Sequence, residues 1–464
     1  MGEKIKNPYR FMMPRLEGAD LGAGAKGEKK YLELAGKGVC GFILFGGRLR
    51  DVREGTKRLQ AASELPLIIA SDLERGLGQQ VEGGTSFPPA MAFGSAFKNG
   101  IGEDVIRRAF SAVAEEALWA GVNMIFAPVL DINSDPENPI IATRAFGEDP
   151  ETVSRLGVMM IEEFQKRGVL ACGKHFPGHG GTRVDSHLAL PAIEKDLKGL
   201  LAFELKPFRA AIAAGVSAVM SGHLRLPLID PSGLPATLSA KVTGILRNEL
   251  GFRGLVVTDA MNMAGLSMEE GRAAALALEA GVDILLHPSA PDEMASYLKS
   301  KKNRADASFL LETMRKNLSP GPRLNEPVFA EHKDLALEIE RRAVRVEGRP
   351  EITGDSVFVV LADEPGVLKP FIDELERAGR RALVNPEESF APGHGPLAAV
   401  VHSAPRAWKP PSERLKRVIG RLSGTGASWI SFGNPYLIYR ERNKILAYSD
   451  SADIQRELAK RVLC

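Results

Sequence analysis

The densest group of reactive side chains lies between Lys174 and His187, in the sequence KHFPGHGGTRVDSH. Its glycines and Pro177 disfavour a regular helix or strand, so we expect these polar side chains on a loop. Asp185 stands two residues before His187 and can accept a hydrogen bond from the imidazole, which would fix its tautomer and raise its pKa. An imidazole held in this way is suited to general acid–base catalysis. The alternative, in which the loop histidines only bond to backbone, accounts less well for so many polar residues in one short loop.

Further polar side chains directly follow apolar runs along the chain. These residues are Asp72, Asp131, Lys174, His175, His223, Asp259 and His287. If the apolar runs are parallel strands, all of these residues lie at carboxyl ends of strands, where barrel enzymes build their sites. Asp259 follows the run that ends at Thr258 and could act as a carboxylate nucleophile, whereas the structural alternative is a helix cap. Their shared position predicts one common site.

Eight apolar runs are typical of strands that are buried on both faces. They are Phe11–Pro14, Val39–Phe45, Pro66–Ser71, Asn123–Leu130, Val169–Gly173, Val216–Ser221, Gly254–Thr258 and Val282–Leu286. Amphipathic segments lie between most of them and predict helices, among them 103–120, 150–167, 200–214, 239–250 and 268–280. Several of these segments end at a glycine in a cap position, namely Gly121, Gly168, Gly215, Gly251 and Gly281. Eight successive strand–helix units predict an α/β fold of the (β/α)₈ TIM-barrel type. A doubly wound sheet is the alternative, but it rarely carries eight such units.

The remainder of the chain predicts a second, smaller α/β unit. Residues 301–347 read as polar helix, and a Gly/Pro-rich break at 348–354 is followed by a new alternation of apolar runs and helical segments. We therefore expect a barrel over residues 1–330, a helical linker over 331–350 and a small α/β sandwich over 351–464. The sandwich has neither a Gly-x-Gly-x-x-Gly fingerprint nor a P-loop, so a nucleotide-binding role is not indicated.

Composition and charge argue against several classes of protein. Hydrophobic residues make up 44% and charged residues 25% of the 464 residues, as in globular proteins. The net charge of +2 gives no field of one sign that would favour nucleic acid or a membrane surface as a partner. Cys40, Cys172 and Cys464 are too few and too far apart for a disulfide framework or a Cys-x-x-Cys metal site. Because the chain shows neither a signal peptide nor a long apolar span, we expect a cytoplasmic protein, whose oligomeric state stays open.

Three stretches carry motifs in a fixed order. The first is KHFPGHG at 174–180 with DSH at 185–187, and the second is DPENP at 135–139 with RAFGEDP at 144–150. The third is the segment GFRGLVVTDAM, which contains Asp259. Together these motifs resemble glycoside hydrolase family 3, in its β-N-acetylglucosaminidase branch. The resemblance covers the chain from about residue 10 to about residue 330.

This resemblance implies a retaining exo-β-N-acetylglucosaminidase that removes terminal N-acetylglucosamine from cell-wall or chitin-derived oligosaccharides, without a metal or cofactor. It implies that Asp259 is the nucleophile of a covalent glycosyl-enzyme intermediate and that His187, assisted by Asp185, is the acid/base. The same resemblance implies that the sugar is held by Asp72, Arg144, Lys174 and His175, with His223 close to the pocket. One imidazole near neutral pKa can protonate the leaving oxygen and later deprotonate water, which agrees with these roles.

The chain departs from the family pattern after Asp72. The segment reads LERGLGQQ where many relatives have Gln-Glu-Gly-Gly, and Gln80 stands where an arginine is expected. In addition, a neutral acid/base repels an anionic nucleophile less than a carboxylate would. A β-N-acetylglucosaminide phosphorylase is therefore one alternative function, and another β-glycosidase of the same family is a second.

Two functions of other classes also compete. A metal-dependent hydrolase could use His175, His179 and His187, but Pro177 prevents the helix that would bring the first two together. A non-catalytic sugar-binding protein would not need the intact Asp-Ser-His and Thr-Asp elements.

Overall fold

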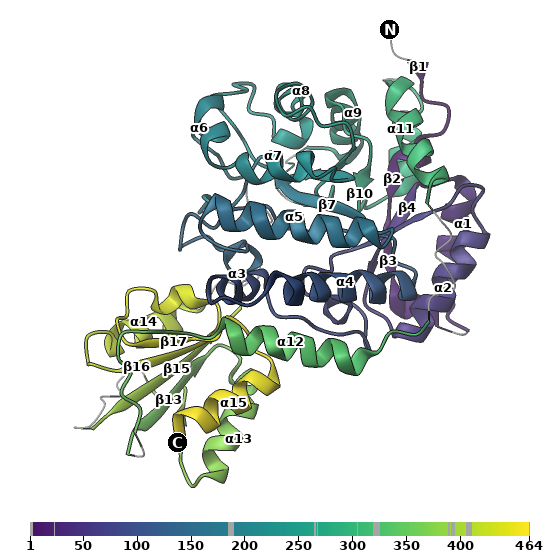
Figure 1. Cartoon of the computed structure of the whole chain (residues 1–464). Coiled ribbons are helices and arrows are strands. Elements are labelled where there is room, and N and C mark those ends of the chain that lie inside the picture. The colour runs from purple at the N-terminus through teal and green to yellow at the C-terminus, as the bar shows by residue number, and fades with distance from the viewer. Residues whose placement is uncertain are drawn as a thin grey trace.

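The chain forms two α/β units, which Figure 1 shows as a larger upper unit and a smaller lower one. The computed structural model describes residues 3–22, 24–183, 190–263, 266, 268–303, 305–318, 325–353, 355–387, 390, 395–404 and 411–463. Among these, no helix combines the length and the apolar character needed to cross a bilayer.

The larger unit is a barrel of parallel strands that follow one another in chain order. Its strands are β2 (Met12–Met13), β3 (Arg15–Glu17), β4 (Gly41–Phe45), β5 (Ile68–Ser71), β6 (Met124–Ile125), β7 (Leu170–Phe176), β8 (Ala218–Ser221), β9 (Leu255–Thr258) and β10 (Leu285–Leu286). Strands β3 to β9 pair in sequence, β10 pairs with β2, and a bridge from Val257 to Ile284 closes the ring. Since β2 and β3 are two halves of one strand around Pro14, each predicted apolar run supplies one strand, and the predicted (β/α)₈ barrel is confirmed.

Alternation along the strands builds two cores. In β5, Ile68 and Ala70 belong to the cluster inside the barrel, whereas Ile69 belongs to the cluster under the helices. Both faces are thus dry, which is why these strands read as continuous apolar runs. Cys40 and Cys172 are buried in the inner cluster, and burial raises the pKa of the Cys40 thiol to about 12. Both therefore act as small hydrophobic residues, as expected from their apolar surroundings.

Helices cover the outside of the barrel. They are α1 (Glu28–Lys37), α2 (Leu49–Ala61), α3 (Ala90–Lys98), α4 (Glu103–Ala120), α5 (Pro150–Lys166), α6 (Leu197–Ala202), α7 (Lys206–Ala213), α8 (Ala240–Gly244), α9 (Glu270–Ala280) and α10 (Pro291–Leu298). Helix α11 (Ala305–Lys316) instead packs against the inner cluster through Leu311. The five predicted cap glycines all have positive φ, between 69° and 99°, the left-handed region that glycine enters without strain. These caps turn the chain back toward the next strand.

The smaller unit is an open sheet between helices. Its order is β12 (Arg345–Glu347), β17 (Lys444–Leu446), β16 (Ser428–Gly433), β15 (Leu397–Ser403), β13 (Val357–Ala362) and β14 (Ala382–Val384). All neighbours are parallel except β12 and β17. Helices α13 (Lys369–Arg377) and α15 (Ala452–Leu463) share a core with one face of the sheet, and α14 (Glu413–Leu422) packs with the other. The predicted small α/β sandwich is confirmed.

Helix α12 (Phe329–Ala343) connects the units and packs against α3 and α4 of the barrel, as Figure 1 shows. It lies largely in the segment expected as a helical linker, which also includes β12. Ser95 of α3 donates a hydrogen bond to the carbonyl of Ala343 (2.6 Å), and Ser451 donates one to Glu340 (2.6 Å). The second unit is therefore held against the flank of the barrel by specific polar contacts.

Candidate active site

A pocket of about 610 Å³ opens at the carboxyl ends of the barrel strands. Its lining includes six of the residues predicted to form the site, namely Asp72, Arg144, Lys174, His175, Asp259 and His287. Asp72 directly follows β5, Lys174 and His175 lie on β7, and Asp259 directly follows β9. The parallel register brings these strand ends to one side of the barrel, so residues far apart in sequence share one pocket.

Lys174 is the centre of a buried ion cluster in this pocket. Its Nζ lies 2.7 Å from Asp72 and 2.6 Å from Glu74, and its side chain is only 2% exposed. Glu74 in turn accepts two hydrogen bonds from the Arg144 guanidinium, at 2.7 and 2.9 Å. This two-pronged contact holds the Arg144 side chain in one orientation at the pocket wall.

The cluster keeps Glu74 and Lys174 charged. Burial alone would raise the pKa of Glu74, but Arg144 and Lys174 outweigh it and hold that pKa far below its usual range. Burial would likewise lower the pKa of Lys174, yet Asp72 and Glu74 hold it above its usual value. Fixed charges in a partly dry pocket make strong, directional hydrogen bonds to hydroxyl groups. Sequence reasoning assigned no role to Glu74, although its position two residues after Asp72 placed it near the same strand end.

His175 is oriented by a second buried carboxylate. Its Nδ1 lies 2.7 Å from Oδ2 of Asp131, a fully buried residue that also accepts the backbone N–H of His179 (2.5 Å). Burial would raise the pKa of Asp131, but His175 and His179 outweigh it and lower this pKa. With Nδ1 engaged, Nε2 is the nitrogen through which His175 can meet a ligand. Asp131, one of the strand-end residues predicted to share the site, therefore completes it as the partner of His175.

Asp259 follows β9 at the pocket floor. The backbone N–H of Ala260 donates to its Oδ1 (2.8 Å), which helps to orient the carboxylate. His223 lies behind this segment, fully buried, and its Nε2 donates to the carbonyl of Ala260 (3.0 Å) while Nδ1 meets the Thr237 hydroxyl (2.9 Å). His223 is not among the residues that line the pocket, but its bond to Ala260, which does line it, places His223 close by, where it positions the backbone beside Asp259.

Asp185 and His187 lie outside the described residues, between Arg183 and Leu190. The described start of their loop is tied to the neighbouring 131–138 segment. Asn138 donates to the carbonyl of His179 (2.9 Å), and Arg183 pairs with Asp135 (2.7 Å). The loop therefore leaves the barrel at the edge of the pocket.

Other pocket residues come from segments with no predicted site role. Gln80 is part of the lining, so an amide occupies the position where an arginine was expected. Arg75 also lines the pocket, and its guanidinium lies 3.3 Å from the Asp450 carboxylate of the smaller unit. The smaller unit itself contributes Ala404 to the lining. Both units thus border the pocket.

The structure describes two of the three histidines that a metal centre would need. Nδ1 of His175 contacts Asp131, and Nδ1 of His179 lies 2.6 Å from the Thr182 hydroxyl. Burial lowers the pKa of His179 to about 4, so its ring is neutral near pH 7. Within the described parts of the chain, no group of three or more potential ligands is arranged around a metal position.

Comparisons with known proteins agree on one family. Residues 15–308 match the family described as "Glycosyl hydrolase family 3 N terminal domain". A β-hexosaminidase A of Pseudoalteromonas piscicida is 37% identical over 303 residues, which are 60% of this chain and 50% of the relative. A β-hexosaminidase of Neisseria meningitidis serogroup C is 35% identical over 284 residues, 59% of this chain and 78% of the relative. This chain therefore spans about half the length of the Pseudoalteromonas protein.

A solved structure extends the likeness to both units. A family 3 β-N-acetylglucosaminidase from Paenibacillus sp. str. FPU-7 has a TM-score of 0.82 and 29% identity, and covers 99% of this chain and 96% of its own.

Proposed function

Because this chain belongs to glycosyl hydrolase family 3, we propose that it is a retaining exo-β-N-acetylglucosaminidase. Its substrates would be oligosaccharides from cell walls or chitin that end in β-linked N-acetylglucosamine. The observation that carries the proposal is the pocket in which Asp259 shares one cavity with the fixed charges of Asp72, Lys174 and Arg144. The names of the relatives, β-hexosaminidase and β-N-acetylglucosaminidase, support the choice of sugar.

In the proposed reaction, Asp259 attacks the anomeric carbon while the bond to the leaving oxygen breaks. His187 gives its proton to that oxygen, and Asp185 supports the imidazolium form before transfer. The glycosyl group is then bound to the Asp259 carboxylate. His187 next takes a proton from water, whose oxygen attacks the anomeric carbon and releases Asp259. Two displacements return the sugar with its original β configuration.

The described side chains would bind the terminal sugar. Asp72 and Lys174 offer an acceptor and a donor at fixed positions, and His175 offers Nε2 because Asp131 engages Nδ1. Arg144, held by Glu74, supplies further N–H groups. Such rigid, charged partners pin the ring so that the anomeric carbon faces Asp259, which lowers the entropic cost of reaching the transition state.

We also propose the division of labour along the chain. Residues 1–330 form the catalytic domain, 331–350 the connection and 351–464 the second domain. The wall contacts of Arg75 and Ala404 support a second domain that borders the site without supplying the reacting groups.

A chromogenic aryl N-acetylglucosaminide assay tests the proposal. Wild type should release the chromophore, and Asp259→Asn should lose on the order of a thousandfold or more in kcat. Equal turnover by the two proteins would contradict it. Repeating the assay with phosphate separates hydrolysis from phosphorolysis, since a phosphorylase would release the sugar as its 1-phosphate.

A further inference from the structure

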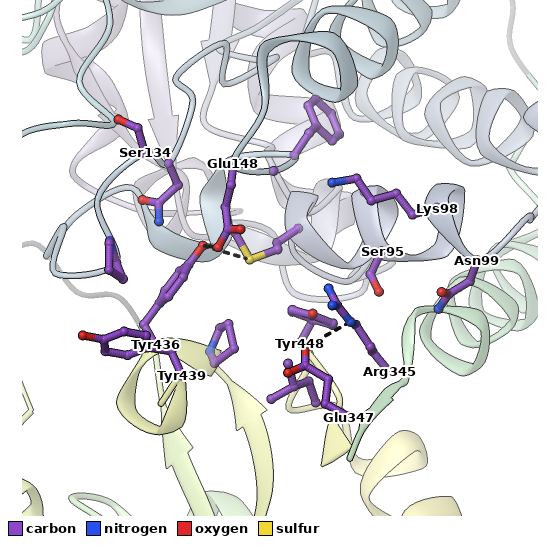
Figure 2. A pocket seen from close by; sticks show the side chains of 18 of the residues that line it. Ser95, Lys98, Asn99, Ser134, Glu148, Arg345, Glu347, Tyr436, Tyr439 and Tyr448 are labelled. Atoms are coloured by element: carbon purple, nitrogen blue, oxygen red, sulfur yellow. Dashed lines mark hydrogen bonds and ion pairs between the residues drawn. The ribbon is translucent and has the colours of Figure 1, made fainter. Parts of the chain in front are cut away.

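A second cavity, of about 850 Å³, lies between the barrel and the smaller unit, and Figure 2 shows it from close by. One side is built by α3 and the 133–148 segment of the barrel. The other side is built by β12, β17 and the residues that follow β16. Its volume falls within the range of small-molecule sites, roughly 300–1,000 Å³. It has no lining residue in common with the catalytic pocket.

Each of the three cationic side chains in this lining is paired with a carboxylate. Arg345 lies 3.0 Å and Lys444 3.1 Å from the Glu347 carboxylate, and Lys98 lies 2.7 Å from Asp149. Glu148 accepts a hydrogen bond from the Tyr436 hydroxyl at 2.7 Å, a contact that Figure 2 shows reaching across the two units. An incoming ion would have to compete with these pairs, so the lining favours a neutral ligand that is rich in hydrogen-bonding groups.

Three tyrosines give the cavity its aromatic surface. Tyr436 and Tyr448 are buried, and Tyr439 is 39% exposed at the rim. Burial raises the pKa of Tyr436, and Glu148 raises it further; burial also raises the pKa of Tyr448. Both hydroxyls therefore stay protonated as hydrogen-bond donors. A tyrosine offers an apolar ring face and a polar tip, which matches the C–H faces and hydroxyl edges of a sugar ring.

One segment of the barrel, residues 133–148, borders both this cavity and the catalytic pocket. Asn133, Ser134 and Glu148 face the cavity, whereas Thr143 and Arg144 of the same segment face the pocket. The Asn133 side chain accepts the backbone N–H of Ala142 (2.9 Å), so a group in the cavity can contact a residue that supports the pocket wall. A ligand in this cavity would lie beside the catalytic pocket without occupying it.

We propose that this cavity is a second binding site, for a neutral oligosaccharide of the same chemistry as the substrate. The choice of N-acetylglucosamine as its building block rests on the proposed function, whereas the preference for a neutral saccharide rests on the tyrosines and the matched charges.

Methionine methyl groups give each pocket its own reporter. Met91 lines the second cavity, where its sulfur lies 3.8 Å from the Tyr436 hydroxyl, and Met220 lines the catalytic pocket. The full chain is labelled with ¹³C-methyl methionine, assigned by Met→Leu variants, and titrated with a hydrolysis-resistant, sulfur-linked disaccharide of N-acetylglucosamine. We expect the Met91 and Met220 signals to titrate with two different dissociation constants.

Two variants assign the Met91 response. Tyr439→Ala should weaken the affinity seen at Met91 by about tenfold or more and leave that at Met220 unchanged. Tyr297→Ala, the matched control on α10, removes a tyrosine that lines neither pocket and should change neither affinity. The second site would be overturned if the Met91 signal did not respond to the ligand. It would also be overturned if the Met91 and Met220 signals gave the same dissociation constant in both variants. A failure of the proposed function would instead leave Met220 silent and the chain without turnover.

Discussion

At the scale of single residues, the site depends on charges that have been removed from water. Lys174 is 2% exposed between Asp72 and Glu74, and Glu74 also holds Arg144. The sequence predicted that Asp72 and Lys174 would meet, because each follows an apolar run, and the family resemblance added Arg144. Neither revealed the counter-ions Glu74 and Asp131, since a single carboxylate carries no pattern that shows which cation it will contact in the fold.

We expect Glu74→Gln to destabilise the protein because it leaves buried Lys174 and partly buried Arg144 short of a counter-ion. The free energy of unfolding in urea should fall by about 3 kcal/mol at pH 7. The control Glu82→Gln changes a carboxylate whose side chain is 76% exposed and should stay within about 0.5 kcal/mol of wild type. Equal, small effects of both substitutions would contradict the cluster.

The same pair of proteins predicts a pH dependence. The pKa of Glu74 is lower in the folded chain than in the unfolded chain, where it is about 4.3. The stability that ionised Glu74 contributes is therefore fully present above the pKa of the unfolded chain. It is lost as the pH falls toward the lower pKa of the folded chain. The stability gap between wild type and Glu74→Gln should be constant from pH 7 to pH 5 and narrow in more acidic buffer. A stability gap that widened in acidic buffer would contradict a lowered pKa of Glu74 in the folded chain.

The acid role of His187 predicts a dependence on the leaving group. His187→Ala should lose about a hundredfold or more on a disaccharide, whose leaving oxygen needs a proton. It should lose much less in the first displacement on an activated aryl glycoside, measured as the burst of released phenol. Asp185→Asn should act in the same direction and more weakly. The same loss on both substrates would exclude an acid role.

At the scale of elements, local patterns predicted the barrel well. Helix α4 spans Glu103–Ala120 as predicted, because a cap glycine and a regular apolar stripe define both ends. The predicted helix over 200–214 is instead two short helices, α6 and α7, that flank Phe203. The predicted helix over 239–250 changes from α8 to a π-turn at Ile245–Glu249. Such irregularities depend on packing against neighbouring elements, and the apolar periodicity of a single segment carries no information about those neighbours.

Gly180 lets the start of the loop that carries Asp185 and His187 pack closely against the backbone of Ile132. A Cβ at this position would overlap the carbonyl oxygen of Ile132, whereas a Cβ at Gly181 would meet only the Ser134 hydroxyl, at 3.0 Å. Gly180→Ala must therefore shift the loop away from the 131–138 segment and should lower kcat/KM by about tenfold or more. Gly181→Ala, the matched control, should retain activity within about twofold. Loss of activity in both or in neither would contradict this role of Gly180.

At the scale of the whole molecule, contacts between residues far apart in sequence hold the second unit on the barrel. Tyr436 donates to Glu148 (2.7 Å), and Asp450 lies between Arg75 (3.3 Å) and His402 (3.2 Å). Burial would raise the pKa of Asp450, but His402 and Arg75 hold it well below its usual value. Pairs between residues so far apart leave no pattern in the local sequence. The sequence therefore predicted two units but did not predict that both line one pocket.

We expect Asp450→Asn to release Arg75 and disturb that wall. KM for the aryl glycoside should rise severalfold with a smaller change in kcat, because Arg75 lines the pocket and has no part in the proposed chemistry. Asp453→Asn is the control, since the Asp453 side chain is 66% exposed and pairs with nearby Arg456. An unchanged KM in Asp450→Asn would show that the second unit does not shape the catalytic pocket.

The proposed reaction requires that Asp259 forms the covalent bond to the sugar. A fluorinated N-acetylglucosaminide that reacts quickly and hydrolyses slowly traps this intermediate, and mass spectrometry of the digested protein locates it. We expect one sugar adduct, on the peptide that contains Asp259. An adduct on a different residue, or steady turnover with no adduct at all, would contradict it.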